Sequence, residues 1–213
     1  MFWAYETLQE HRQTLGNRHP ITIASINNLG VLLVNQGDLA GAAPLLREAM
    51  QASRETLGGR HLDTLASIGS LGVLLQKQGD LEGAAVMLRE ATRASRETFG
   101  NRHPTTVSLI NNLGMLQQEQ GDLDGAATLV REALHVSRET LGNRHPTTLA
   151  SIRNLGLLLG LMGSLNNQRE TVEALTLLRE LQTSLGGSSP QGLLDTLHEL
   201  DTRASTCGRD LTV

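Results

Sequence analysis

The sequence predicts an all-α protein, a solenoid of stacked antiparallel helix pairs. The first observation is a period of 42 residues, because the segment 27–30 returns at 69–72, 111–114 and 153–156. A fixed period between about 20 and 50 residues is typical of repeat architectures. The second is that two helical patterns alternate within each period. The third is composition: hydrophobic residues make up 39% of the chain but aromatic residues only 2%, so the core must be aliphatic, which suits close helix packing.

The first helix of the unit is clearest between Pro20 and Gly37. Its apolar residues follow spacings of three, three and four, which puts them on one face of a helix. They are Ile23, Ile26, Leu29 and Leu33. Pro20 suits a first helical position, where its missing N–H is not needed. Gly37 is typical of a left-handed helix stop. We therefore expect a helix over this segment and over each of its copies.

A second helix is predicted from Asp38, a good N-cap, to Leu57, with Gly58 closing it. Its buried face again follows spacings of three and four: Ala42, Leu46, Ala49 and Ser53. Gly30 lies within the first helix, where glycine costs roughly 1 kcal/mol relative to alanine. It recurs at 72, 114 and 156, so we expect a packing reason. The small residue Ala42 and its copies at 84 and 126 are the expected partners.

These positions carry a resemblance to a known family. The tetratricopeptide repeat signature is similar to Asn28-Leu29-Gly30, Leu33, Gln36-Gly37-Asp38-Leu39, Ala42, Leu46 and Ala49. The longer 42-residue unit and its Leu-Gly-Asn-Arg-His-Pro linker resemble the repeats of kinesin light chains and nephrocystin-like proteins, over about residues 1–186. The usual aromatic positions are Leu, Val or Met here. The resemblance implies a tetratricopeptide-repeat superhelical solenoid that serves as a scaffold.

The repeats divide the chain in order. A half repeat consisting only of a second helix is expected first, then three near-identical repeats, a divergent fourth repeat, a capping helix and a frayed tail. The corresponding ranges are 1–16, 17–58, 59–100, 101–142, 143–187, 188–204 and 205–213. The capping helix is expected because the open end of a repeat stack needs a polar cover.

The half repeat holds Phe2, Trp3 and Tyr5, three of the four aromatic residues in the chain. One interpretation is that these rings cover the N-terminal edge of the stack. The other is that the edge pairs with another molecule, or that the chain is cut from a longer array. In the fourth repeat, the apolar run 157–162 is too short to span a bilayer.

The net charge limits the kinds of molecule that the protein can bind, and the cysteine content indicates the redox state of its compartment. A formal net charge of −4 and a pI near 6.0 leave no basic footprint, so nucleic acid and anionic membrane are excluded as partners. The single cysteine, Cys207, rules out an internal disulfide framework and fits a reducing compartment. No signal peptide is visible, so a cytoplasmic location is expected.

No catalytic constellation is evident, so we predict that the protein is not an enzyme and needs no cofactor or metal. Four loop histidines recur at the 42-residue step: His19, His61, His103 and His145. Stacked helices lie about 10 Å apart, and zinc binds its ligands at about 2 Å, so one ion cannot join them. They are interpreted as structural loop residues. Arg54 and Glu55, with their copies, are expected on a solvated outer face.

The first helices are expected to line a concave groove that binds a peptide. Asparagine carries both donors and acceptors, so a row of them can pair with an extended backbone above an apolar floor. The predicted groove residues are Asn27, Asn28, Val31, Asn35, Ser70, Val73, Lys77, Asn111, Asn112, Met115, Glu119, Arg153, Asn154 and Leu157. By resemblance, Asn28, Asn112 and Asn154 contact the ligand main chain. The alternative is that these amides bond only neighbouring backbone or the next repeat.

The groove lacks the clamp by which chaperone adaptors of the family grip a C-terminal carboxylate, because the matching places hold Ala24, Ala66, Ser108 and Ala150. The isolated basic residues Lys77 and Arg153 indicate instead a ligand with one or two acidic residues. The predicted function is a non-catalytic protein–protein interaction scaffold that binds a peptide segment. The alternative function is a structural or homo-oligomerisation element that associates through the N-terminal edge or the fourth repeat.

Overall fold

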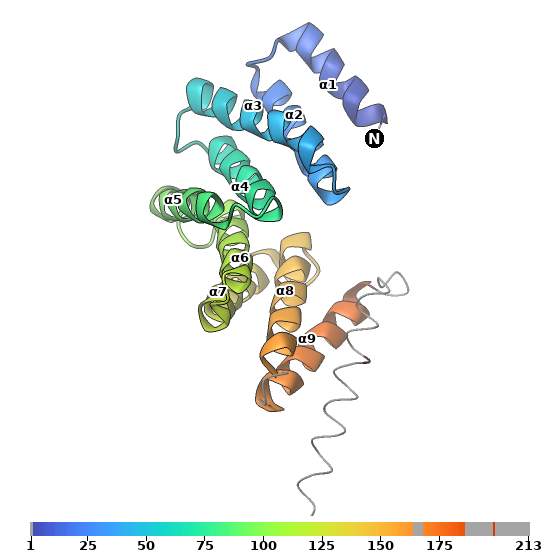
Figure 1. The fold of residues 1–213 in the computed structure, drawn as a ribbon, viewed down its shortest axis with the longest axis vertical. Helices are drawn as coiled ribbons and strands as arrows, with labels where there is room; N and C mark the ends of the chain where they lie inside the picture. Colours follow the sequence, from blue (N-terminus) through green and yellow to red (C-terminus); the bar gives the residue numbers. More distant parts are fainter. Residues whose placement is uncertain (1, 164–167, 186–197, 199–213) are drawn as a thin grey trace, which may run out of the picture. The chain divides into compact units, whose positions relative to one another are not determined.

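The computed structural model describes residues 2–163, 168–185 and 198, and no strand occurs among them (Figure 1). The helices of this part of the chain are α1 (Phe2–Leu15), α2 (Pro20–Asn35), α3 (Leu39–Leu57), α4 (Leu62–Lys77), α5 (Leu81–Phe99), α6 (Pro104–Glu119), α7 (Leu123–Leu141), α8 (Pro146–Gly163) and α9 (Gln168–Leu185). The prediction of an all-α fold is confirmed.

The chain forms two compact units, residues 1–116 and 117–213. In the first unit, α2 packs against α3 and α4 against α5, so each pair is a helix hairpin. Helix α1 packs against α2, and α3 packs against α4, which joins the hairpins side by side. In the second unit, α8 packs against both α7 and α9.

Local signals set the ends of the helices as expected. Helix α2 begins at Pro20, and the turn after it contains Gly37 with a φ of +83°. Asp38 then caps α3, because its Oδ1 accepts a hydrogen bond from the Gly41 N–H at 2.9 Å. Helix α3 ends before Gly58, whose φ of +89° favours glycine. The predicted start and stop signals are confirmed.

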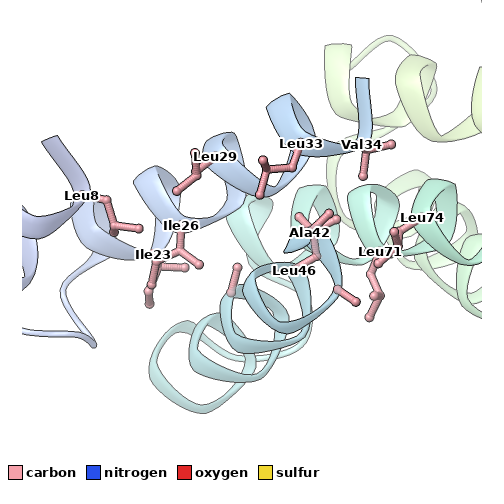
Figure 2. Close-up of a cluster of buried hydrophobic side chains, with 12 residues drawn as sticks. Leu8, Ile23, Ile26, Leu29, Leu33, Val34, Ala42, Leu46, Leu71 and Leu74 are labelled. Atoms are coloured by element: carbon pink, nitrogen blue, oxygen red, sulfur yellow. The ribbon is translucent and has the colours of Figure 1, made fainter. Parts of the chain in front are cut away.

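The core of the first unit forms where the apolar faces of consecutive helices meet. Figure 2 shows Ile26 and Leu29 of α2 close to Leu46 of α3, with Leu8 of α1 at one end of the cluster. The predicted face of α2 is at most 1% exposed at Ile23, Ile26, Leu29 and Leu33. Burial of such aliphatic side chains contributes about 1.5–3 kcal/mol each. Both predicted apolar faces are confirmed.

The close approach of α2 and α3 at Gly30 has a different partner from the expected Ala42. A Cβ added at Gly30 would lie 2.5 Å from Cδ2 and 2.7 Å from Cγ of Leu46. At Gly72, the equivalent clash is with Leu88. The helices therefore cross one turn further along than expected, and glycine makes room for a fully buried leucine.

The second unit departs from the pattern at α8, which has 18 residues where α2, α4 and α6 have 16. Its core joins α8 to α7 and α9 through Val130, Leu134, Ile152, Leu155, Leu159, Leu178 and Leu181. The predicted capping helix at 188–204, apart from residue 198, and the predicted tail at 205–213 lie outside the described residues. The repeat boundaries stay a prediction.

Candidate functional site

Helices α2, α4 and α6 meet at a cavity of about 360 Å³, and all the residues that line it belong to the first unit. It is lined by Val31, Val34 and Asn35 of α2, by Ala66, Gly69, Ser70 and Val73 of α4, and by Pro104, Thr105, Ser108, Leu109 and Asn112 of α6. Five of the predicted groove residues are therefore brought together: Val31, Asn35, Ser70, Val73 and Asn112. None of the twelve lining residues carries a charge.

The two amides in this lining are open to a ligand. Asn35 is exposed at the end of α2, and Asn112 is half-buried on α6. Neither side-chain amide has a hydrogen-bond partner in the part of the chain that the structure describes. Ser70, in contrast, already donates its hydroxyl to the carbonyl oxygen of Ala66 at 3.2 Å. Asn35 and Asn112 are thus the groups of this cavity that are ready to bond a polypeptide main chain.

The other predicted residues of the first unit lie in more varied surroundings. Asn28 and Lys77 are exposed, and Asn27 and Met115 are half-buried. Asn111 is only 6% exposed, and its Oδ1 is buried without a hydrogen-bond partner. Little of the Asn111 amide is open to a ligand.

In the second unit, Glu119 and Arg153 are exposed and Leu157 is half-buried. Asn154 is 7% exposed, and its Oδ1 accepts hydrogen bonds from Nε and Nη2 of Arg153 at 3.4 Å. The asparagine row expected along the first helices therefore divides. Asn28 and Asn112 remain accessible, whereas Asn154 is occupied by its neighbour.

Two residues of the cavity lining, Gly69 and Leu109, differ from the residues at the same positions of the other repeats. This difference is the one feature of the sequence that could have drawn attention to them. Gly69 stands where two other copies have Asn27 and Asn111 and the fourth has Arg153. Leu109 stands where the other first helices have serine, at 25, 67 and 151. Leu109 was not expected on the groove face at all. Because both changes fall on facing helices, the wall of the cavity is more apolar here than the repeat pattern predicts.

The loop histidines cap the first helices. Nδ1 of His19 accepts a hydrogen bond from the Ile21 N–H at 3.3 Å. The same bond recurs at 3.2 Å for His61, His103 and His145, each to the N–H two residues further on. Among the described residues, no three histidine, cysteine, aspartate or glutamate side chains gather as metal ligands would. These cap hydrogen bonds support the interpretation of the four histidines as structural loop residues.

Arginine–glutamate pairs join the second helices of neighbouring hairpins. Arg18, in the loop before α2, pairs with Glu55 of α3 at 2.6 Å. Between second helices, Arg54 of α3 lies 3.8 Å from Glu90 of α5. Arg138 of α7 pairs with Glu180 of α9 in the same way. The residues 54 and 55 are exposed, as expected, but they also connect repeats. This second role was not predicted, because the pairs appear only when the copies are stacked.

The carboxyl group of Glu55 is the titrating group whose environment is most clearly altered. A hydrogen bond from the Gln51 side chain at 3.0 Å, followed by the charge of Arg18, lowers its pKa below the ordinary value. The group lies on the solvated outer face, away from the cavity residues. It therefore stabilises the stack and takes no part in the candidate site.

Two aromatic rings of α1 face solvent. Trp3 is 77% exposed and Tyr5 is 42% exposed. Both interpretations of these residues, a cover for the N-terminal edge and an edge that pairs with another molecule, stay predictions.

Helix hairpins joined side by side, with a cavity between successive first helices, define an α-helical repeat protein. A model of the tetratricopeptide repeat matches residues 22–97, and a second model of this repeat matches residues 106–147. Together they cover more than half of the chain. The chain belongs to the tetratricopeptide-repeat family, and the prediction of a tetratricopeptide-repeat solenoid is confirmed.

Solved structures show the same fold. The kinesin light chain-like repeats of Podosopora anserina share 24% sequence identity, with a TM-score of 0.68 over 90% of this chain and 89% of theirs. BtubC (BKLC) from P. vanneervenii shares 21% identity, with a TM-score of 0.64 over 98% of this chain and 89% of its own. No curated protein matches the sequence. The fold thus resembles the kinesin light chain type of repeat, as expected.

The tetratricopeptide repeat is a non-catalytic, protein-binding type of fold, so it indicates a scaffold with protein partners. Within the described residues, no helix has the length and apolar character needed to cross a membrane.

Proposed function

We propose that this protein is a non-catalytic interaction scaffold that holds a peptide segment of a partner protein along its first helices. The observation that carries the proposal is the cavity shared by α2, α4 and α6, with the unpaired amides of Asn35 and Asn112 in its lining. Ligand sites of this kind combine an apolar wall with a few polar groups that orient the ligand.

The residues in and beside the cavity would contact different parts of a bound peptide. The amides of Asn35 and Asn112 each offer a donor and an acceptor, which is what the main chain of an extended segment requires. Val31 and Val73 supply an apolar floor for ligand side chains. Lys77 follows Val73 by one turn of α4, about 6 Å along the helix, and is exposed. A carboxylate of the ligand beside this ammonium group would add favourable charge at one end.

Sequence composition supports a protein partner in a reducing compartment. The acidic balance disfavours nucleic acid and anionic lipid, and the single cysteine fits the cytoplasm. We therefore expect a cytoplasmic protein or peptide as the ligand, and no cofactor.

The test uses a library of displayed random peptides selected on the full chain. Affinities of the selected peptides are then compared between the unchanged protein and the variant Asn35→Ala with Asn112→Ala. Loss of two amide contacts of about 1 kcal/mol each predicts a roughly tenfold or greater loss of affinity. The matched control is Asn17→Ala with Asn101→Ala, which removes two exposed amides from the loops before α2 and α6.

Peptides that bind both double variants with unchanged affinity would place the binding surface elsewhere and reject the proposal. Circular dichroism melting of each variant shows whether the fold is kept. Asn35 is exposed and Asn112 is half-buried, so both alanine variants should melt close to the unchanged protein.

A second candidate function is association of the protein with itself through the N-terminal edge. The observation that favours it is the exposure of Trp3 and Tyr5 on α1. Leu161 of α8 and Val172 of α9 are 49% and 54% exposed, so the last repeat also carries apolar side chains open to solvent. Light scattering over a dilution series would show a mass that falls on dilution, and Trp3→Ser would abolish this dependence. A constant monomer mass rejects this candidate.

A further inference from the structure

We propose that the cavity beside Gly69 and Leu109 is the anchor subsite of the groove, and that it takes one uncharged aliphatic side chain of the bound polypeptide. The inference rests on the proposed function. It adds the chemical class of the ligand residue for which the groove is selective. It follows from two departures of this chain from its own repeat pattern.

Gly69 makes room for Leu109 of the facing helix α6, at the register where two other copies, Asn27 and Asn111, carry an asparagine side chain. A Cβ added at Gly69 would lie 2.9 Å from Cδ2 of Leu109 and 3.9 Å from Nδ2 of Asn112. Leu109 and Asn112 both line the cavity, so a side chain at position 69 would displace part of the cavity wall. In α6, the equivalent asparagine, Asn111, is buried. The glycine of α4 is therefore the packing partner of Leu109, and the Gly69–Leu109 contact forms this part of the cavity wall.

Leu109 changes the character of the same volume. The other first helices have serine at this register, whereas Leu109 is apolar, lines the cavity and, at 2% exposed, forms the buried base of its wall. Where the repeat pattern would place an asparagine on one first helix and a serine on the next, α4 has Gly69 and α6 has Leu109. The wall gains an apolar surface and loses two polar groups.

The residues that line the cavity disfavour a charged ligand side chain. None of the twelve lining residues is charged, so an ionised side chain would lose hydration without gaining a counter-charge. Val31, Val73 and Leu109 provide apolar contact from three helices. The volume of about 360 Å³ is at the lower end of the range of roughly 300–1,000 Å³ for ligand pockets, which suits one side chain and its two flanking peptide groups.

The peptide groups on either side of that side chain have partners in place. Asn35 lies at the α2 side of the cavity and Asn112 at the α6 side, each with a free amide. An aliphatic residue seated between them can exchange main-chain hydrogen bonds with both. The inferred ligand element is therefore a leucine-like or methionine-like residue within an extended segment.

The experiment titrates N-acetyl-L-leucinamide, which consists of one aliphatic side chain and two peptide groups, into the full chain with labelled valine and leucine methyl groups. We expect saturable NMR shifts at Val31, Val73 and Leu109 with millimolar affinity. N-acetyl-L-lysinamide should leave these methyl groups unshifted.

Variants that restore the repeat pattern supply the comparison. Gly69→Asn should weaken binding of the leucine probe by about tenfold or more, because the added side chain would displace Leu109 from the cavity wall. Gly69→Asn with Leu109→Ser restores the pair found in other copies and covers the case in which the single variant folds poorly. The matched control is Gly59→Asn, which restores the asparagine of the other loops at a position where an added Cβ meets nothing within 4 Å.

Absence of methyl shifts in the unchanged protein, or equal probe affinity for the Gly69→Asn variants and the Gly59→Asn control, would overturn the inference. Its failure is separable from failure of the proposed function. Selected peptides that depend on Asn35 and Asn112 but bind the Gly69→Asn variants normally would support a peptide groove and reject the anchor subsite. If the probe binds but the selection yields no peptide, the cavity is a site for small apolar molecules and the subsite is rejected with the groove.

Discussion

Nη2 of Arg12 in α1 lies 2.9 and 2.7 Å from the two carboxylate oxygens of Glu48 in α3, across 36 positions of the sequence. One repeat later, Arg54 and Glu90 stand in the same relation but 3.8 Å apart. These pairs connect one second helix to the next, so they favour one register of the stack over its neighbours.

The two pairs should differ in strength. Arg12 and Glu48 are 29% and 38% exposed, whereas Arg54 and Glu90 are 52% and 62% exposed. After allowance for solvent screening, we expect a coupling free energy of about 0.5–1 kcal/mol for the first pair and near zero for the second. Double-mutant cycles with Arg12→Gln and Glu48→Gln, followed by urea unfolding, measure the first value. The same cycle at 54 and 90 is the control, and equal couplings would contradict the geometric argument.

The histidine cap of α2 should contribute to stability through its acceptor nitrogen. In His19→Ala, the Ile21 N–H loses its partner, and loss of a side-chain cap costs about 0.5–2 kcal/mol. His19→Asn should retain most of this free energy, because the asparagine side chain is a good cap acceptor. Urea midpoints of the two variants distinguish the effects. A similar loss in both would show that the imidazole acts by packing and not as a cap.

Gly30 should not tolerate alanine, although alanine is the better helix former. Propensity favours the change by roughly 1 kcal/mol, but overpacking a core costs about 1–3 kcal/mol. Leu46 is 0% exposed and lies where the new methyl group would be, so we expect a net loss of up to about 2 kcal/mol. Thermal unfolding measures the change. Gly59→Ala, with open space around it, should be neutral, and an equally destabilised Gly59→Ala would contradict this account.

The carboxyl group of Glu55 should titrate below an ordinary glutamate. The Gln51 hydrogen bond and the Arg18 charge lower the folded-state pKa. Its stabilising contribution is therefore fully present above the unfolded-state pKa and disappears as the pH falls through the lower folded-state value. NMR titration of the side-chain carboxyl carbon should show an upward shift of the midpoint in Gln51→Ala. A midpoint that is the same in both proteins would contradict the assigned cause.

Most of the local structure could be predicted from short-range signals. Proline, aspartate and glycine mark the helix ends, and the spacing of Ile23, Ile26, Leu29 and Leu33 marks the buried face. These signals act within one or two helical turns, so they do not depend on the rest of the fold. The expected partner of Gly30 was wrong because the crossing point of two helices depends on how whole side chains interlock.

The candidate site was only partly predictable. Val31, Asn35, Ser70, Val73 and Asn112 were placed on the groove face by helical periodicity alone. The roles of Gly69 and Leu109 depend on a contact between helices 40 residues apart in sequence. Their departure from the repeat pattern was visible, but its effect on the cavity needed both helices in position.

By itself, the sequence determined the class of fold, the two-helix unit and the faces that are buried, because the 42-residue period repeats the same local rules. The tertiary structure decided which amides stay open, which arginine meets which glutamate, and where the groove holds an apolar cavity. Those features arise between helices, where side-chain volume and the packing of neighbouring repeats determine which atoms come into contact.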